Sequence, residues 1–143
     1  MKQYSILIIL ALLTLINCTS AKQAGKGNEI SIIGRWELKD MPVSLLTPGK
    51  LYPARKPYLS FDTSKTRFSG NTGCNSLSGP MDINGKSIKF KEPIMMTKMA
   101  CLDGMEGENL FLQTLKETNS YRIKDSILNF FKGDRLLMQF VKR

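Results

Sequence analysis

The fold of this chain is decided at residues 67–79, which read Arg67-Phe68-Ser69-Gly70-Asn71-Thr72-Gly73-Cys74-Asn75-Ser76-Leu77-Ser78-Gly79. The stretch is rich in turn formers and predicts a short strand, Arg67 to Gly73, that ends in a sharp bend. Glycine-rich loops can cradle phosphates, but no helix follows and no Lys-Ser or Lys-Thr completes a P-loop. We therefore favour a tight bend or bulge between strands, with Asn75 hydrogen-bonded to its free backbone groups.

Short segments that alternate apolar and polar residues lie on both sides of this stretch, and each predicts a half-buried strand. Asn84-Gly85 predicts a hairpin, and Gly133-Asp134 a further turn. Met41–Pro57 carries five prolines or glycines and predicts a long loop. The expected strands are Gly34–Asp40, Tyr58–Asp62, the run Pro93–Met99, Tyr121–Lys124, a segment through Leu128 and Phe130, and Leu136–Phe140 with Leu136, Met138 and Phe140 inward.

One helix is expected after Asp103, which can cap it, with Glu106 three residues later. Leu110, Phe111, Thr114 and Leu115 then share one face. Gly107 weakens the first turn by up to about 1 kcal/mol. The fold class is therefore mainly β (α+β): a small antiparallel barrel or two-sheet sandwich with one packed helix.

The N-terminus has the pattern of a lipoprotein signal peptide, residues 1–17. Lys2 precedes an apolar segment that is too short for an ordinary membrane span, and Leu15-Ile16-Asn17-Cys18 resembles a bacterial lipobox. Residues 18–29 then form the lipidated Cys18 and a polar tether, and residues 30–143 one domain. A plain cleaved signal and an uncleaved anchor remain as alternatives. Because no Asp follows Cys18, we expect the outer membrane, facing the periplasm.

The composition excludes much catalytic chemistry. The 143 residues include no histidine, which removes Ser-His-Asp and Cys-His nucleophile pairs and His-containing zinc sites. The net charge of +9 could favour nucleic acid, anionic lipid headgroups or acidic proteins. The charges are scattered, however, with no basic helix and no aromatic stacking motif. A solvated basic surface is favoured, and nucleic acid is not expected as a partner.

Two cysteines remain once Cys18 is lipidated, and an even number in an oxidising compartment favours a Cys74–Cys101 disulfide. Two unpaired thiols or a redox-active pair are the alternatives, the latter disfavoured because there is no C-x-x-C. The methionines Met95, Met96, Met99 and Met105 could bind Cu(I), but we expect them to fill the core. Carboxylate catalysis is not expected either, because Asp103 and Glu106 suit the helix terminus.

The chain resembles the META domain family over roughly residues 32 to 141. The resemblance lies in residues 67–79, in Met95-Met96-Thr97-Lys98-Met99-Ala100-Cys101, in Trp36 with Leu38, in Pro57-Tyr58-Leu59-Ser60-Phe61-Asp62 and in Leu136-Leu137-Met138-Gln139-Phe140. It implies a small antiparallel barrel with one helix in an envelope protein linked to stress. The motif residues that it marks as structural are Gly70, Asn71, Gly73, Cys74, Asn75, Gly79, Met99 and Cys101.

These observations predict a non-enzymatic envelope lipoprotein without catalytic residues, metal or cofactor. It would be held to the membrane through its N-terminal lipid and would act as a stress-related maintenance factor that binds another envelope protein. An exposed apolar patch, around Met41–Pro57 for example, would favour that role. The alternative is a barrel that carries a small ligand or lipid, which needs an unfilled interior. Large inward residues such as Trp36, Phe61, Phe90, Phe130 and Phe140 argue against it.

Overall fold

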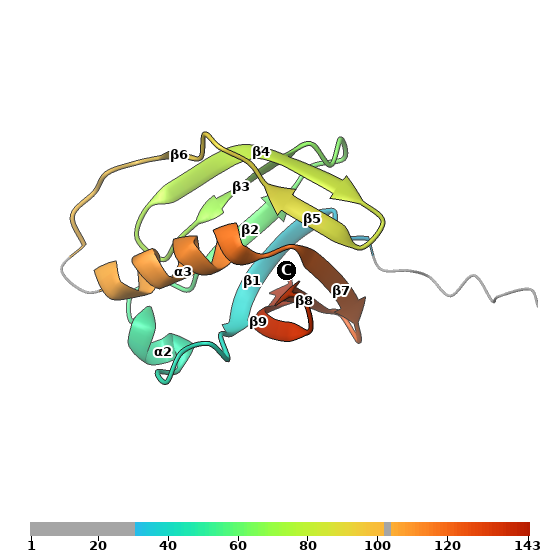
Figure 1. The fold of residues 1–143 in the computed structure, drawn as a ribbon. Helices are drawn as coiled ribbons and strands as arrows, with labels where there is room; N and C mark the ends of the chain where they lie inside the picture. Colours follow the sequence, from blue (N-terminus) through green and yellow to red (C-terminus); the bar gives the residue numbers. More distant parts are fainter. Residues whose placement is uncertain (1–30, 102–103) are drawn as a thin grey trace, which may run out of the picture.

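A computed structural model describes residues 31–101 and 104–143 (Figure 1). Cys18 and Asp103 therefore lie outside the described residues. The elements are β1 (Gly34–Asp40), α2 (Pro48–Leu51), β2 (Tyr58–Phe61), β3 (Arg67–Asn71), β4 (Ser76–Asn84), β5 (Ser87–Phe90), β6 (Met95–Met96), α3 (Met105–Glu117), β7 (Ser120–Lys124), β8 (Ile127–Lys132) and β9 (Arg135–Lys142).

The nine strands form one antiparallel sheet that closes into a ring. Their order is β3-β2-β1-β9-β8-β7-β5-β4-β6, and β3 also pairs with β4. β4 is the longest described strand, and one of its edges pairs with β3. Its other edge is long enough to pair with β6 in the N-terminal half of β4 and with β5 in the C-terminal half. Helix α3 lies across the ring before the chain continues into β7 (Figure 1). The predicted class, an antiparallel β fold with one packed helix, is confirmed.

Aromatic side chains fill the interior of the ring. Phe130 is fully buried and its ring centroid lies 6.4 Å from that of Phe61, 5.7 Å from Phe90 and 5.3 Å from Phe140. Trp36, from β1, is also fully buried, and its indole Nε1 donates to the carbonyl of Ile32 at 2.6 Å. The inward residues of the alternating strands thus form one continuous core.

Helix α3 packs against α2 through a glycine. A Cβ on Gly107 would lie 2.6 Å from the carbonyl oxygen of Leu51 and 2.6 Å from Cε1 of Tyr52, so only glycine allows this approach. The Tyr52 hydroxyl donates to the Gly107 carbonyl at 2.8 Å, and burial raises the pKa of Tyr52. Gly107 therefore weakens the helix locally but permits its docking, a role that the sequence pattern did not reveal.

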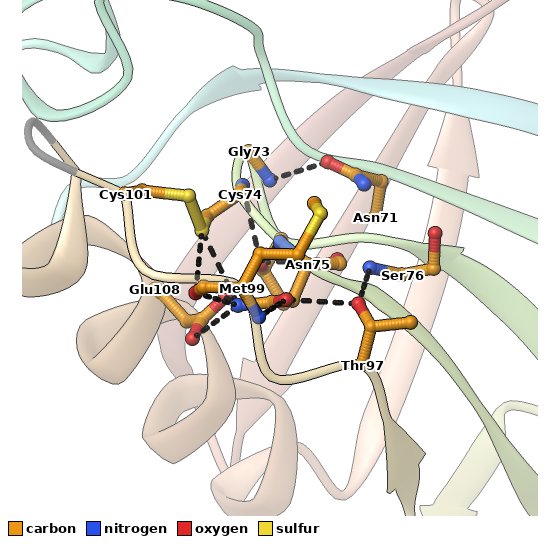
Figure 2. The surroundings of a disulfide bond; sticks show 10 residues. Asn71, Gly73, Cys74, Asn75, Ser76, Thr97, Met99, Cys101 and Glu108 are labelled. Carbon is orange, nitrogen blue, oxygen red and sulfur yellow. Dashed lines mark hydrogen bonds between the residues drawn. A yellow bond between two sulfur atoms is a disulfide. The ribbon is translucent and has the colours of Figure 1, made fainter.

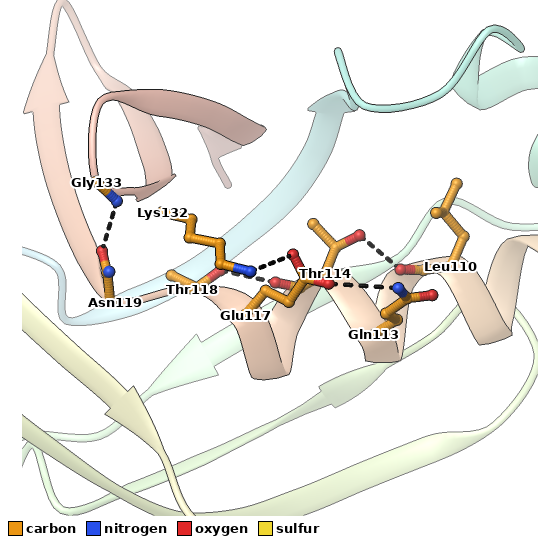
Figure 3. A network of polar contacts seen from close by, with 8 residues as sticks. All are labelled: Leu110, Gln113, Thr114, Glu117, Thr118, Asn119, Lys132 and Gly133. Atoms are coloured by element: carbon orange, nitrogen blue, oxygen red, sulfur yellow. Dashed lines mark hydrogen bonds and ion pairs between the residues drawn. The ribbon is translucent and has the colours of Figure 1, made fainter.

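The C-terminal end of α3 is fastened to the β8–β9 turn (Figure 3). Lys132 Nζ pairs with Glu117 at 3.2 Å, and the Gly133 amide donates to Asn119 Oδ1 at 3.1 Å. The Lys132 ammonium lowers the pKa of Glu117 through their hydrogen bond. These contacts hold the end of the helix and the start of β7 beside the β8–β9 turn.

Several local predictions were wrong. The Met41–Pro57 loop contains α2, because Pro48 suits the first turn of a helix and Leu51 enters the core. Leu137 is buried in place of Leu136, since the β8–β9 register shifts after Phe130. Only Met95–Met96 of the extended run is a strand. The α3 N-cap is Gly104, which has no side chain to cap the helix.

Among the described residues, no helix is both long and apolar enough to cross a membrane.

We expect Phe130→Ala to lower the free energy of unfolding by about 3–5 kcal/mol, because it leaves a cavity at the centre of the aromatic cluster. Phe131→Ala is the control. Phe131 is half-buried on the other face of β8, with the Arg122 guanidinium 4.7 Å from its ring centroid, so we expect a loss of about 1 kcal/mol. Urea unfolding measures both; equal losses would contradict this description of the core.

Candidate functional site

The two segments that carry the sequence motifs meet at one place. β6 pairs with the start of β4, with Met96 opposite Leu77 and Met95 opposite Ser78. The pairing continues one residue further, where the Thr97 amide donates to the Ser76 carbonyl at 3.1 Å. The β3–β4 turn and the segment that leads from β6 to α3 are therefore neighbours, although more than 20 residues separate them.

The bend after β3 is closed by its own side chains. Thr72 Oγ1 accepts hydrogen bonds from the amides of Asn75 at 2.9 Å and Cys74 at 3.3 Å. Asn71 Oδ1 accepts from the amide of Gly73 at 2.8 Å. The predicted tight bend is thus present, but Asn71 and Thr72 satisfy its backbone and the Asn75 side chain does not. The expected role of Asn75 was wrong.

Asn75 instead holds the β6–α3 segment. Its side chain is 2% exposed, and Oδ1 accepts from the Met99 amide and the Thr97 hydroxyl, each at 2.8 Å. Nδ2 donates to the Met99 carbonyl at 3.2 Å (Figure 2). A planar amide that offers both a donor and an acceptor can bind both backbone groups of one residue, which explains why Asn suits this position.

Helix α3 joins this network through Glu108. Its carboxylate accepts from Asn75 Nδ2, at 3.2 Å and 3.1 Å for the two oxygens, from the Asn75 amide at 3.2 Å and from the Thr72 hydroxyl. Glu108 therefore ties the helix to the bend. This role was not predicted from the sequence, where its only signal was an acidic residue in the first turn of the helix.

The predicted disulfide between Cys74 and Cys101 is present, with the two Cα atoms 6.1 Å apart. It joins the bend to the chain just before α3 (Figure 2). Disulfide and amide network act on the same segment, so residues 95–101 are held against the ring from both ends.

A groove runs over the outer face of β2, β3 and β4 beside this segment. Its larger part is about 450 Å³ and is lined by Tyr58, Ser69, Gly70, Ser76, Leu77, Ser78, Met95, Met96 and Thr97. A smaller part of about 280 Å³ adjoins it at Ser69 and Ser78 and reaches Asp62 and Arg67. Small side chains form the floor: Ser69 lies opposite both Ser60 and Ser78 in the sheet. The Arg35 guanidinium lies 3.6 Å from the Tyr58 ring centroid at one wall.

Glycines of the motif permit this close packing. A Cβ on Gly70 would lie 2.2 Å from the Tyr58 carbonyl oxygen and 3.2 Å from the buried Leu59 side chain, so β3 can approach β2 here only with glycine. Gly79, on β4, lies against the Phe68 ring. Most motif residues are thus assembled around the groove and its supporting network, while Gly79 belongs to the core.

The expectation that the methionines fill the core was wrong for three of the four. Met95, Met99 and Met105 are 59%, 61% and 62% exposed, and only Met96 packs against the core. The reason lies in the topology. β6 is a two-residue strand at the margin of the sheet, and Met99 is held by its backbone, which leaves its side chain outside.

We expect the double variant Cys74→Ser/Cys101→Ser to be about 3.5 kcal/mol less stable in oxidising buffer, the chain-entropy value for closing a loop over this separation. Denaturant unfolding measures it. Wild type treated with reductant should match the variant. If oxidised and reduced wild type are equally stable, the disulfide does not stabilise the fold.

The comparisons with known proteins agree with this architecture. A protein from Burkholderia xenovorans, solved by NMR, is 18% identical with a TM-score of 0.61, over 77% of this chain and 81% of that one. A DUF4847 family protein from Bacteroides vulgatus, solved by crystallography, is 15% identical with a TM-score of 0.53, over 77% of this chain and 92% of that one. At these identities the likeness shows the fold alone. No curated protein matches.

The family model described as META domain matches residues 31–143. The match spans both motif segments, the helix and every described strand. The match covers most of the chain, and the ring of strands and the motif network lie within it: the chain belongs to the META domain family.

Proposed function

We propose that this chain is a non-enzymatic lipoprotein of the bacterial envelope that binds an extended segment of another envelope protein in the groove beside β6. The observation that carries the proposal is the construction of the site. The disulfide and the Asn75 amide hold the segment that forms one wall of the groove, and Glu108 in turn binds Asn75.

The chemistry of the groove suits a protein segment. Met95 exposes a flexible, polarisable thioether at its wall, and methionines of this kind adapt to varied apolar side chains. Serine hydroxyls on the floor can donate to or accept from a peptide backbone.

A role as a carrier of small ligands inside the ring is less well supported. The side chains that would have to leave space, such as Trp36, Phe130 and Phe140, are fully buried and pack against one another. Both parts of the groove lie on the outer face of the sheet. The absence of histidine from the sequence is the basis for proposing a non-enzymatic role.

The proposed location rests on the sequence and on cysteine chemistry. The lipobox-like residues 15–18 favour lipidation at Cys18, with the domain on the periplasmic side of the outer membrane. A structural disulfide is typical of proteins in oxidising compartments such as the periplasm. The stress-related role in envelope maintenance is proposed from the family alone.

We expect Cys18→Ser to move the protein from the salt-washed membrane fraction to the soluble fraction, because a lipid at this residue is the proposed anchor and high salt weakens contacts made by charge alone. Fractionation and immunoblotting measure the change. Cys101→Ser, which leaves the N-terminus intact, is the control and should stay with the membrane. A Cys18→Ser protein that remains in the salt-washed membrane fraction after signal cleavage would contradict the anchor.

We expect Ser78→Trp to block the groove, because Ser78 lines both of its parts and an indole would fill the space above the floor. A photo-crosslinking residue in place of Met95 should capture one envelope protein in cells. Ser78→Trp should weaken that capture at least about tenfold, which corresponds to about 1.4 kcal/mol of binding free energy.

Lys89→Trp is the matched control, since Lys89 is exposed on β5 and lines neither part of the groove. It should leave the capture unchanged. An equal loss of capture in the Ser78→Trp and Lys89→Trp proteins, or normal capture by the Ser78→Trp protein, would contradict the groove as the binding site.

A further inference from the structure

The loop between β1 and β2 presents two leucines to solvent. Leu45 is 105% exposed and Leu46 40%. The base of the loop is fixed, because Met41, Leu51 and Tyr52 are buried in the core. The tip is held by the Ser44 amide, which donates to the Met41 carbonyl at 3.0 Å, and by the Leu46 amide, which donates to Ser44 Oγ at 2.9 Å. The exposure is therefore built into the loop.

The charges of this loop all have one sign. Residues 41–57 contain three basic residues, Lys50, Arg55 and Lys56, and no acidic residue. All three basic side chains are exposed. Lys50 belongs to α2, four residues after Leu46, and its amide donates to the Thr47 carbonyl at 2.9 Å. An apolar tip thus stands beside positive charge on one protruding segment.

We propose that this loop docks on the surface of an anionic lipid bilayer, with Leu45 and Leu46 inserted at the boundary of headgroups and acyl chains. Lys50, Arg55 and Lys56 would then lie among phospholipid headgroups. Leucines that enter this boundary and basic residues that face anionic lipids are the two contributions that bind amphipathic surface elements to membranes.

A bilayer fits this surface better than a folded protein does. A stable protein interface buries about 800 Å² on each partner. Two leucines at the tip of a loop offer only a small part of such an area, whereas a membrane needs no complementary shape. Neither Leu45 nor Leu46 lines the groove proposed for a protein partner.

The arrangement in the fold allows a second contact with the membrane besides a lipid anchor. The described chain enters β1 at Gly34, and the loop begins where β1 ends, at Asp40 (Figure 1). β1 is seven residues long, or about 23 Å. The twelve residues between Cys18 and Ser31 can span about 40 Å when extended. An anchor at Cys18 and the loop can therefore engage the same bilayer, which would fix the orientation of the domain.

The test uses the mature chain, residues 18–143, with Cys18→Ser so that no lipid contributes. Flotation with vesicles of phosphatidylcholine alone, and of phosphatidylcholine mixed with phosphatidylglycerol, measures binding. We expect binding to the anionic vesicles only. Leu45→Ser should weaken it at least about tenfold, the effect of withholding one leucine from an apolar environment. Lys50→Gln/Arg55→Gln/Lys56→Gln should weaken it by about fivefold for each charge.

Lys86→Gln/Lys124→Gln is the control, because both lysines are exposed in the β4–β5 and β7–β8 hairpins, outside the loop. It should lose at most a small part of the binding, and thermal unfolding should be unchanged in all variants. The proposal is overturned if wild type does not bind anionic vesicles, or if Leu45→Ser binds as wild type does. It is also overturned if the control loses as much per charge as the loop variant, which would indicate binding by net charge alone.

Discussion

The Asn75 side chain is the constraint on which the site depends. A single buried amide contacts both backbone groups of Met99, the hydroxyl of Thr97 and the carboxylate of Glu108. It thereby connects the β3–β4 turn, the β6–α3 segment and helix α3. Because each of these groups is wholly or partly removed from water, losing the amide would leave several unpaired polar atoms, each costing about 1–3 kcal/mol. The disulfide reinforces a junction that hydrogen bonds already define.

The molecule combines a filled interior with an outer surface of small side chains at the groove. Inside the ring, Phe130 and its aromatic neighbours pack against one another and support the sheet from within. Outside, the short side chains of the serines leave a shallow surface on β3 and β4 between Tyr58 and Met95. A groove of this kind is a property of the sheet surface, so its shape persists without a ligand. For the proposed binding role, a groove formed by the sheet itself would limit the entropy cost of binding.

The two proposed contacts use different physics at different places. The groove would recognise a chain through backbone hydrogen bonds and adaptable thioethers, which gives selectivity. The β1–β2 loop would contact lipid through two leucines and non-directional positive charge, which gives orientation with little selectivity. Together with an anchor at Cys18, membrane contact would present the groove in a restricted set of directions. From composition alone, the net charge of +9 indicates a solvated basic surface. Under this proposal, three of the basic residues, Lys50, Arg55 and Lys56, would bind anionic headgroups.

Local pattern in the sequence determined the strands, the Asn84-Gly85 hairpin and the amphipathic face of α3, because a period of two or 3.6 residues and turn chemistry act over short distances. The pairing of Cys74 with Cys101 could also be predicted, by counting cysteines. The sequence could not reveal that Gly107 is needed for the approach of α2, that Glu108 meets Asn75, or that Met95 and Met99 face solvent. Each of these depends on which segments become neighbours when the ring closes. Contacts between residues far apart in the chain leave no periodic trace in it, and so only the tertiary structure decided them.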